Sequence, residues 1–262
     1  MRWIFRNKTE INRGMVTKAD FQLVRSLSDK QARLEHGLFV AEGDKLVGEI
    51  AANPNWVIER LFVTEDSKVP SSQAEVVSPK EIERLSSLKS APRSLALVRL
   101  PKRKEFTPNK EELIIALDEV QDPGNLGTII RTADWYGIRH IVCSPTTADC
   151  FAPKVVQATM GALLRVELTY TDLAEWLTKA QAQGLTTYAT TLDGENIHTS
   201  HLTKGGVIIM GNEGKGVSPR VQALAERKLF IPPYPADRRG SESLNVAIAT
   251  AITCENFRNK KG

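Results

Sequence analysis

The sequence has few of the residues that build disulfide frameworks or metal clusters. Its 262 residues include three cysteines, Cys143, Cys150 and Cys254, and 4 histidines. Three cysteines cannot all pair, and none stands in a Cys-x-x-Cys motif, so we expect neither a disulfide scaffold nor a zinc site. The histidines are scattered singly, and we expect no bound metal. A reducing, cytoplasmic environment fits this cysteine usage.

Long apolar runs are also missing. The longest, residues 113–117 and 207–210, have the length of a strand, whereas a membrane-spanning helix needs about 20 apolar residues. We therefore expect no membrane partner. Residues 2–13 are basic and lack the apolar centre of a secretory signal. We expect the natural start at Met15, with an upstream extension before it; a very short mitochondrial-type leader is the alternative.

What is present is an ordinary globular composition with an uneven charge. Hydrophobic residues make up 41% of the chain and charged residues 25%. Residues 1–110 carry 20 Lys and Arg against 14 Asp and Glu, whereas residues 111–262 carry 15 against 17. A basic half next to a near-neutral half suggests one part that attracts a polyanion and one that carries chemistry. A merely solvated basic surface is the alternative.

The periodicity of apolar residues predicts two α/β domains joined by a linker. Residues 15–100 form the first, residues 101–110 a basic linker with two prolines, and residues 111–262 the second. Strands are predicted over 38–41, 58–63, 94–100, 113–118, 140–143, 166–170, 186–190, 207–210 and 228–231. Helices are predicted over 18–37, 44–52, 79–88, 125–136, 153–163, 173–182, 219–225 and 243–257.

In the first predicted helix, Phe21, Val24, Leu27 and Leu34 share one broad face. The regular alternation of strands and helices in the second domain predicts a parallel sheet covered on both faces. Ligands of such sheets bind in the loops at the carboxyl ends of the strands. Three of these loops carry candidate functional residues.

The first loop follows the strand over 113–118. Asn125 stands where the next helix would have its N-cap, and Arg131 lies off the apolar stripe that faces the core. A helix N-terminus with an arginine nearby suits an anion. The alternatives are a purely capping role for Asn125 and a surface ion pair for Arg131.

The second loop is rich in glycine. Gly211, Gly214 and Gly216 follow a buried strand and would let the backbone approach a ligand. The loop is not a nucleotide-binding P-loop, because Lys215 is followed by glycine, and its spacing does not match the dinucleotide fingerprint of dehydrogenases. Glu213 is either idle in solvent or the carboxylate nearest the reacting group.

The third loop, residues 230–245, is rich in proline and leads into the last helix. Ser243 can cap that helix, and Asn245 is either a ligand-facing residue or an ordinary first-turn residue. The helix carries a narrow apolar stripe flanked by small side chains, which suits close packing on the sheet or on a second subunit. The stripe consists of Leu244, Ile248, Ala251 and Ile252.

In this order, the three loops resemble the motifs of the SpoU, or TrmH-type, branch of the SPOUT RNA methyltransferases. The resemblance rests on Asn125 and Arg131, on the stretch 211–214, and on Ile231-Pro232 with the stretch 243–246. Residues 153–162 also look like this family. Residues 39–47 resemble the substrate-binding domain that many members carry.

The resemblance implies a parallel-sheet SPOUT domain with a C-terminal trefoil knot, preceded by a small α/β substrate-binding domain. It implies S-adenosylmethionine as cofactor and a homodimer with the active site at the subunit interface. The implied cofactor-binding residues are Gly211, Asn212, Gly214, Gly216, Ile231, Pro232, Ser243 and Leu244.

The implied activity is methylation of a ribose 2′-hydroxyl in structured RNA, with ribosomal RNA as the first choice. A transfer-RNA methyltransferase and a non-catalytic RNA-binding or ribosome-assembly protein on the same fold are the alternatives. The implied catalytic residues are Asn125, Arg131, Glu213 and Asn245. The chain departs from the family in a longer loop over 233–242, where Asp237, Arg238 and Arg239 are expected to contact RNA or reshape the cofactor rim.

Overall fold

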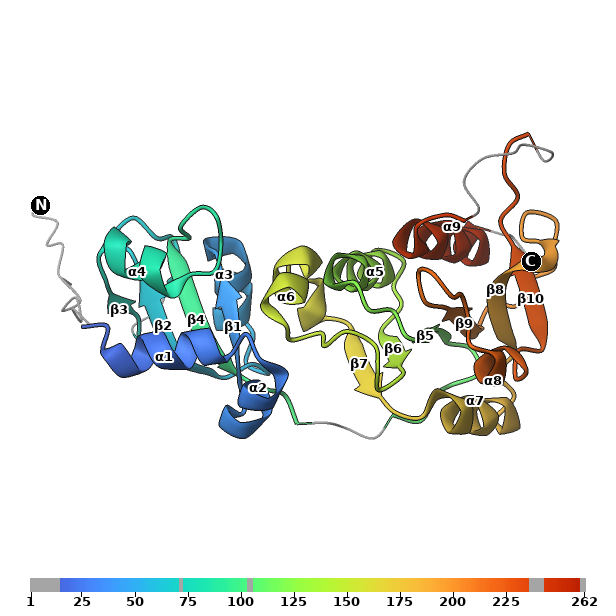
Figure 1. Ribbon diagram of the computed structural model, residues 1–262, viewed down its shortest axis with the longest axis horizontal. Coiled ribbons are helices and arrows are strands. Elements are labelled where there is room, and N and C mark those ends of the chain that lie inside the picture. Colours follow the sequence, from blue (N-terminus) through green and yellow to red (C-terminus); the bar gives the residue numbers. More distant parts are fainter. Residues whose placement is uncertain (1–14, 71–72, 103–105, 236–242, 260–262) are drawn as a thin grey trace, which may run out of the picture. The chain divides into compact units, whose positions relative to one another are not determined.

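The structure is a computed structural model that describes residues 15–70, 73–102, 106–235 and 243–259. Its contacts divide the chain into two units, the first made of residues up to 102 together with the segment 151–157, and the second of the remainder. Figure 1 shows the helices and strands of both units. Each unit is an α/β structure, as predicted.

The first unit is built on a four-stranded sheet in the order β1-β4-β2-β3, with β4 antiparallel to both of its neighbours. A buried cluster that includes Phe62, Ile82 and Leu97 lies between this sheet and the helices. The strands are β1 (Leu38–Glu42), β2 (Ile58–Val63), β3 (Glu75–Val76) and β4 (Ser94–Arg99). The helices are α1 (Lys18–Ser26), α2 (Lys30–His36), α3 (Asp44–Ala51) and α4 (Pro79–Leu85). The two-residue strand β3 was not predicted.

The prediction of one helix over 18–37 is wrong. Asp29 caps a second helix through its side chain, which accepts a hydrogen bond from the Ala32 N–H. The new helix turns Leu34 to solvent and buries Arg33. The Arg33 guanidinium donates to the carbonyls of Leu27, at 2.7 Å, and Ser28, at 3.0 Å, just beyond the end of α1. The apolar periodicity therefore did not reveal that polar residues separate two helices here.

The second unit is built on a six-stranded parallel sheet in the order β10-β8-β9-β5-β6-β7. Its strands are β5 (Leu113–Leu117), β6 (His140–Cys143), β7 (Glu167–Tyr170), β8 (Thr187–Asn196), β9 (Gly206–Met210) and β10 (Arg227–Phe230). The central strands β5 and β9 are buried along their whole length. This burial confirms the predicted sheet with both faces covered.

Helices α5 (Pro123–Trp135) and α9 (Val246–Asn259) lie side by side on one face of the sheet, and α7 (Leu173–Ala182) and α8 (Pro219–Gln222) cover the other (Figure 1). One buried cluster joins Leu177 of α7 and Val221 of α8 to Ile114 and Ile209 of the central strands. On the opposite face, Phe257 of α9 meets the ring of Tyr188 edge-on at 5.0 Å.

Two further helix predictions are corrected by the structure. Helix α6 covers only Pro153–Thr159, because Met160 and Gly161 both take positive φ angles, and the 3-10 turn η1 (Ala162–Leu164) follows. A helix cannot continue through such residues. The last helix begins at Val246 and not at Ser243.

The trefoil knot implied by the resemblance depends on how the chain threads between Ile231 and Asn245. Residues 236–242, which include Asp237, Arg238 and Arg239, lie outside the described residues. The knot and the role of these three side chains therefore stay predictions.

Candidate active site

The first loop begins where β5 ends and contains a helix cap that was assigned to the wrong residue. The carboxylate of Asp122, not Asn125, caps α5 by accepting the Asn125 N–H at 2.8 Å. Asn125 therefore lies in the first turn, where its side-chain amide is available to other partners. Asp122 was missed because the Pro-Gly pair after it resembles a turn, although proline is common at the first position of a helix.

The core face of α5 is as predicted. Leu126, Ile129, Ile130 and Ala133 are fully buried. The loop before the helix is held by Ser144, whose hydroxyl accepts the N–H of Glu119 at 2.9 Å. Glu119 takes a φ of 61°, which is uncommon for a residue with a side chain and is often found at functional sites.

The second loop is a tight, self-supported turn after β9. The backbones of Asn212 and Gly216 exchange two hydrogen bonds of 2.9 Å. A Cβ at Gly211 would lie 2.1 Å from the backbone nitrogen of Val217, so this glycine is required by the loop itself. The space around Gly214 is more open, since a Cβ there would meet only the Asn212 side chain, at 3.8 Å.

The side chain of Asn212 stabilises this loop through hydrogen bonds. Its oxygen accepts the N–H groups of Gly214, at 3.0 Å, and Lys215, at 3.1 Å, while its amide donates to the Glu119 carbonyl at 2.8 Å. Asn212 therefore ties the second loop to the first. Asp118 makes a similar connection, because it is buried and its carboxylate accepts the N–H of Ser218 at 2.7 Å. Asp118 was not predicted as a site residue, although its place at the end of a buried strand indicates a position near the ligand-binding loops.

Three of the four predicted catalytic residues meet in one chain of hydrogen bonds. The amide of Asn125 donates to Glu213 at 3.0 Å, and the Asn125 oxygen accepts from the amide of Asn245 at 2.9 Å. Residues 88 and 120 positions apart from Asn125 are thereby joined. We call Asn125, Glu213 and Asn245 the polar junction.

Glu213, in the second loop, accepts three hydrogen bonds from the first loop. Its carboxylate also accepts the backbone N–H groups of Asp122, at 3.2 Å, and Gln121, at 3.4 Å. Partial burial raises the pKa of Glu213, but the hydrogen bonds from Asn125 and from these backbone groups outweigh it and leave the pKa below its ordinary value of 4.5. The group is therefore a stable carboxylate that holds the first and second loops together.

Asn245 completes the junction from the third motif. It directly precedes α9, and its oxygen accepts the N–H groups of Ala247, at 3.0 Å, and Ile248, at 3.3 Å. Asn245 thus does the capping that was predicted for Ser243, while its amide reaches Asn125. Ser243 and Leu244 precede it on the surface, and Ile231 and Pro232 are half-buried at the end of β10.

Arg131 stands apart from the polar junction. It is exposed and forms no hydrogen bond or ion pair with another described residue. It lies six positions after Asn125, which corresponds to about 9 Å along the helix axis and about 120° around it. Among the described residues, the Arg131 guanidinium is therefore left without an internal partner.

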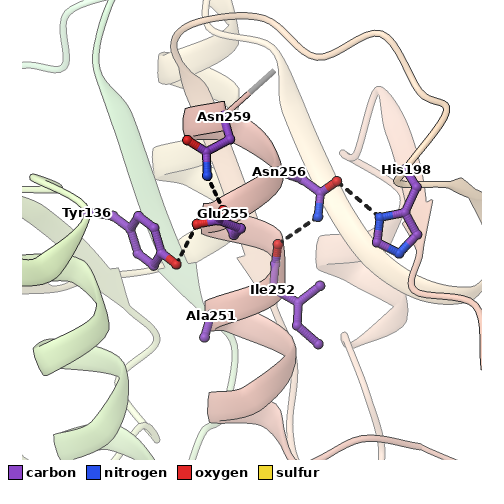
Figure 2. Close-up of a pocket in the computed structure, with 7 residues that line it drawn as sticks. All are labelled: Tyr136, His198, Ala251, Ile252, Glu255, Asn256 and Asn259. Atoms are coloured by element: carbon purple, nitrogen blue, oxygen red, sulfur yellow. Dashed lines mark hydrogen bonds between the residues drawn. The ribbon is translucent and has the colours of Figure 1, made fainter. Parts of the chain in front are cut away.

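A shallow groove of about 540 Å³ lies against the second half of α9, with Tyr136 and His198 beside it (Figure 2). In it the Tyr136 hydroxyl donates to Glu255 at 2.8 Å, which raises the pKa of Tyr136, and His198 pairs with Asn256 at 3.2 Å. The groove is lined by Tyr136, His198, Ala251, Ile252, Glu255, Asn256 and Asn259.

Among the described residues, no group of three or more His, Cys, Asp or Glu side chains is arranged to hold a metal ion. Within the same ranges, no helix has the length and apolar character needed to cross a bilayer.

The parallel sheet, with a glycine-rich loop and a polar junction at the carboxyl ends of its strands, defines a cofactor-binding α/β enzyme. The chain belongs to the SpoU rRNA methylase family, whose model matches residues 112–255. Residues 20–96 match the model of the MRM3-like substrate binding domain.

Similar proteins and similar solved structures support this family membership. The chain is 29% identical over 240 residues to the 23S rRNA (guanosine(2553)-2′-O)-methyltransferase RlmP of Bacillus subtilis, covering 89% of this chain and 94% of RlmP. A putative RNA methyltransferase of the TrmH family from Porphyromonas gingivalis is 38% identical, with a TM-score of 0.83 and coverage of 95% and 100%. An AdoMet-bound rRNA methyltransferase from Sinorhizobium meliloti is 30% identical, with a TM-score of 0.83 and coverage of 93% and 95%.

Proposed function

We propose that this chain is an S-adenosylmethionine-dependent methyltransferase that methylates a ribose 2′-hydroxyl in ribosomal RNA. The observation that carries the proposal is the polar junction, which brings three family motifs to one place at the carboxyl ends of the sheet. The relatives' names support the reaction, because RlmP is named as a 23S rRNA 2′-O-methyltransferase. They also favour ribosomal over transfer RNA.

The residues present fit the cofactor. Gly214 and Gly216 have open space where a side chain would be, so a ligand can approach their backbone closely. The AdoMet-bound relative from Sinorhizobium meliloti supports the same cofactor here. The residues that would hold it are Gly211, Asn212, Gly214, Gly216, Ile231, Pro232, Ser243 and Leu244. When bound, it supplies an electrophilic methyl group.

The chain's own residues would position the nucleophile. A guanidinium stays protonated, so Arg131 acts by clamping an RNA phosphate and orienting the neighbouring 2′-hydroxyl. Asn125 and Asn245 present amide groups to the sugar. Glu213 holds Asn125 in place, and Glu213 or the RNA phosphate would accept the proton that leaves the 2′-hydroxyl. A non-catalytic binding protein would not need this arrangement.

We also propose a homodimer formed through α9 and α5. The predicted apolar stripe of α9 faces outward, since Leu244 and Ile248 are about half exposed, and Trp135 at the end of α5 is 84% exposed. Two further members of the stripe, Ala251 and Ile252, line the groove of Figure 2. Exposed apolar side chains grouped on one face favour an interface with a second copy.

The remaining proposals concern organisation. Residues 15–100 would act as the substrate-binding domain, 101–110 as linker and 111–262 as the methyltransferase domain with a trefoil knot, in the cytoplasm. The family-model match to residues 20–96 supports the first assignment.

The test is a map of 2′-O-methylated positions across all RNAs in cells with and without the gene. We expect one ribosomal site to lose its methyl group when the gene is deleted, and to regain it on expression of the intact chain but not of Arg131→Ala. Loss of a transfer-RNA site instead would favour the alternative substrate.

A further inference from the structure

The first unit carries a groove of about 420 Å³ between α1 and α4, far in sequence from the polar junction. Three of its residues, Lys18, Gln22 and Arg25, are spaced as i, i+4 and i+7 and therefore share one face of α1. Arg84 joins them from α4, and Phe21 forms the apolar part of the lining. The groove is thus a basic surface made by two helices.

The positive charges of this groove are not neutralised. Lys18, Arg25 and Arg84 are exposed and form no ion pair with another described residue. Arg60 of the same unit contrasts with them, because it pairs with Asp20 at 2.7 Å and Glu75 at 2.6 Å. Unpaired cations that converge on one surface are typical of phosphate contacts.

The nearby carboxylate of Glu81 is occupied elsewhere. It lies close enough to Arg84 for the guanidinium to contribute to lowering the pKa of Glu81. Its main partner is Ser78, whose hydroxyl and N–H donate to it at 2.7 Å and 2.8 Å. This capping box fixes Glu81 at the start of α4 and leaves the Arg84 donors available.

Arg84 is pre-organised by an aromatic ring. Its guanidinium carbon lies 4.5 Å from the centre of the Phe21 ring, which itself packs against the buried cluster of this unit. Stacking restrains the guanidinium and leaves its N–H donors free for a planar, two-pronged contact with phosphate. Less side-chain entropy is then lost on binding.

We infer that the α1–α4 groove binds the sugar–phosphate backbone of the RNA substrate. This inference rests on the proposed function for the identity of the RNA, and it adds the surface that holds it. The lining offers one ammonium group and two guanidinium groups, and Gln22 is its single uncharged polar side chain. The groove therefore supplies affinity and not sequence choice.

The test measures binding of the full chain to an in vitro transcript of bacterial 23S rRNA at several salt concentrations. The variant Lys18→Gln/Arg25→Gln/Arg84→Gln should lose affinity by roughly tenfold to a hundredfold at moderate salt, because about three phosphate contacts are lost. Its slope of log K against log salt should become shallower by about 2 to 3. S-adenosylmethionine binding and the melting temperature should not change.

A matched control removes the same charge from the second unit. Arg139 and Lys204 are exposed and stand just before β6 and β9, and Lys179 is exposed in the last turn of α7, which leads into β8. The one ion pair among them, between Lys204 and Glu111 at 3.9 Å, is open to solvent. Their triple glutamine variant should bind RNA like the unaltered chain. Arg84→Lys alone should keep most of the salt slope but lose some affinity, since a point charge cannot replace the fork.

The results of these binding and methylation assays distinguish failure of the groove as an RNA surface from failure of the proposed function. If the unaltered chain binds and methylates the transcript and the groove variant does so equally well, the groove is not the RNA surface and the proposed function stands. Equal losses in the groove variant and the control would also overturn the inference, because only net charge would then matter. If the unaltered chain neither binds nor methylates any 23S rRNA, the proposed function fails and the inference with it.

Discussion

We expect Arg131 to determine the rate of methyl transfer and the polar junction to hold the loops of the site in position. Arg131 is exposed and unpaired within the described chain, so its substitution removes no internal contact. We expect Arg131→Ala to keep the melting temperature and cofactor affinity but to lower methyl transfer by about a hundredfold or more, the usual effect of losing one key electrostatic group. Single-turnover assays with labelled cofactor measure it, and Arg131→Lys should restore only part of the rate. Near-normal turnover of Arg131→Ala would remove Arg131 from the mechanism.

Because the pKa of Glu213 is lowered, we expect the contribution of Glu213 to stability to depend on pH. A carboxylate whose pKa is lower in the folded than in the unfolded state adds stability above its ordinary value of 4.5, and this is lost as pH falls through the lowered pKa. Glu213→Gln should therefore melt below the unaltered chain at pH 6, and the gap should narrow below about pH 4.5. Melting curves between pH 6 and pH 3.5 test this. A gap that stays constant with pH would show that the carboxylate charge is not what stabilises the junction.

Among the elements, the cap at the start of α5 can be tested by substitution. Asp122→Ala should lower the free energy of unfolding by about 1 kcal/mol, because the first turn of α5 loses its side-chain acceptor. Ser218 provides the control, since it precedes α8 but its side chain makes no capping hydrogen bond. Ser218→Ala should have a much smaller effect. Denaturant unfolding of both variants checks the difference, and equal effects would refute the cap.

The elements also show what the sequence could and could not predict. Buried strands such as β5 and helices with one apolar face such as α7 follow from periodicity, because burial alone decides their pattern. The points where helices end do not follow from periodicity. Asp29 and Arg33 divide one expected helix into two, and Met160 ends another through its positive φ. The motif residues were found one by one, but their junction joins residues about a hundred positions apart, which local spacing does not reveal.

At the scale of the whole molecule, the dimer is the prediction most open to direct measurement. Ile248 is 51% exposed on the outward face of α9, so Ile248→Glu would place a charge in the proposed interface and should give a monomer. Leu192 of β8 is 68% exposed outside that face, and Leu192→Glu should leave the dimer intact. Sedimentation velocity at micromolar concentration distinguishes these species. A monomeric unaltered chain would contradict the proposal.

We propose that the polar junction and Arg131 together direct a methyl group to a ribose oxygen. The most direct measurement incubates the purified full chain with labelled S-adenosylmethionine and 23S rRNA, digests the RNA and identifies the labelled nucleoside by mass spectrometry. We expect a single 2′-O-methylated nucleoside with the intact chain and almost none with Arg131→Ala. Label on a base, or no label in RNA although the cofactor binds, would contradict it.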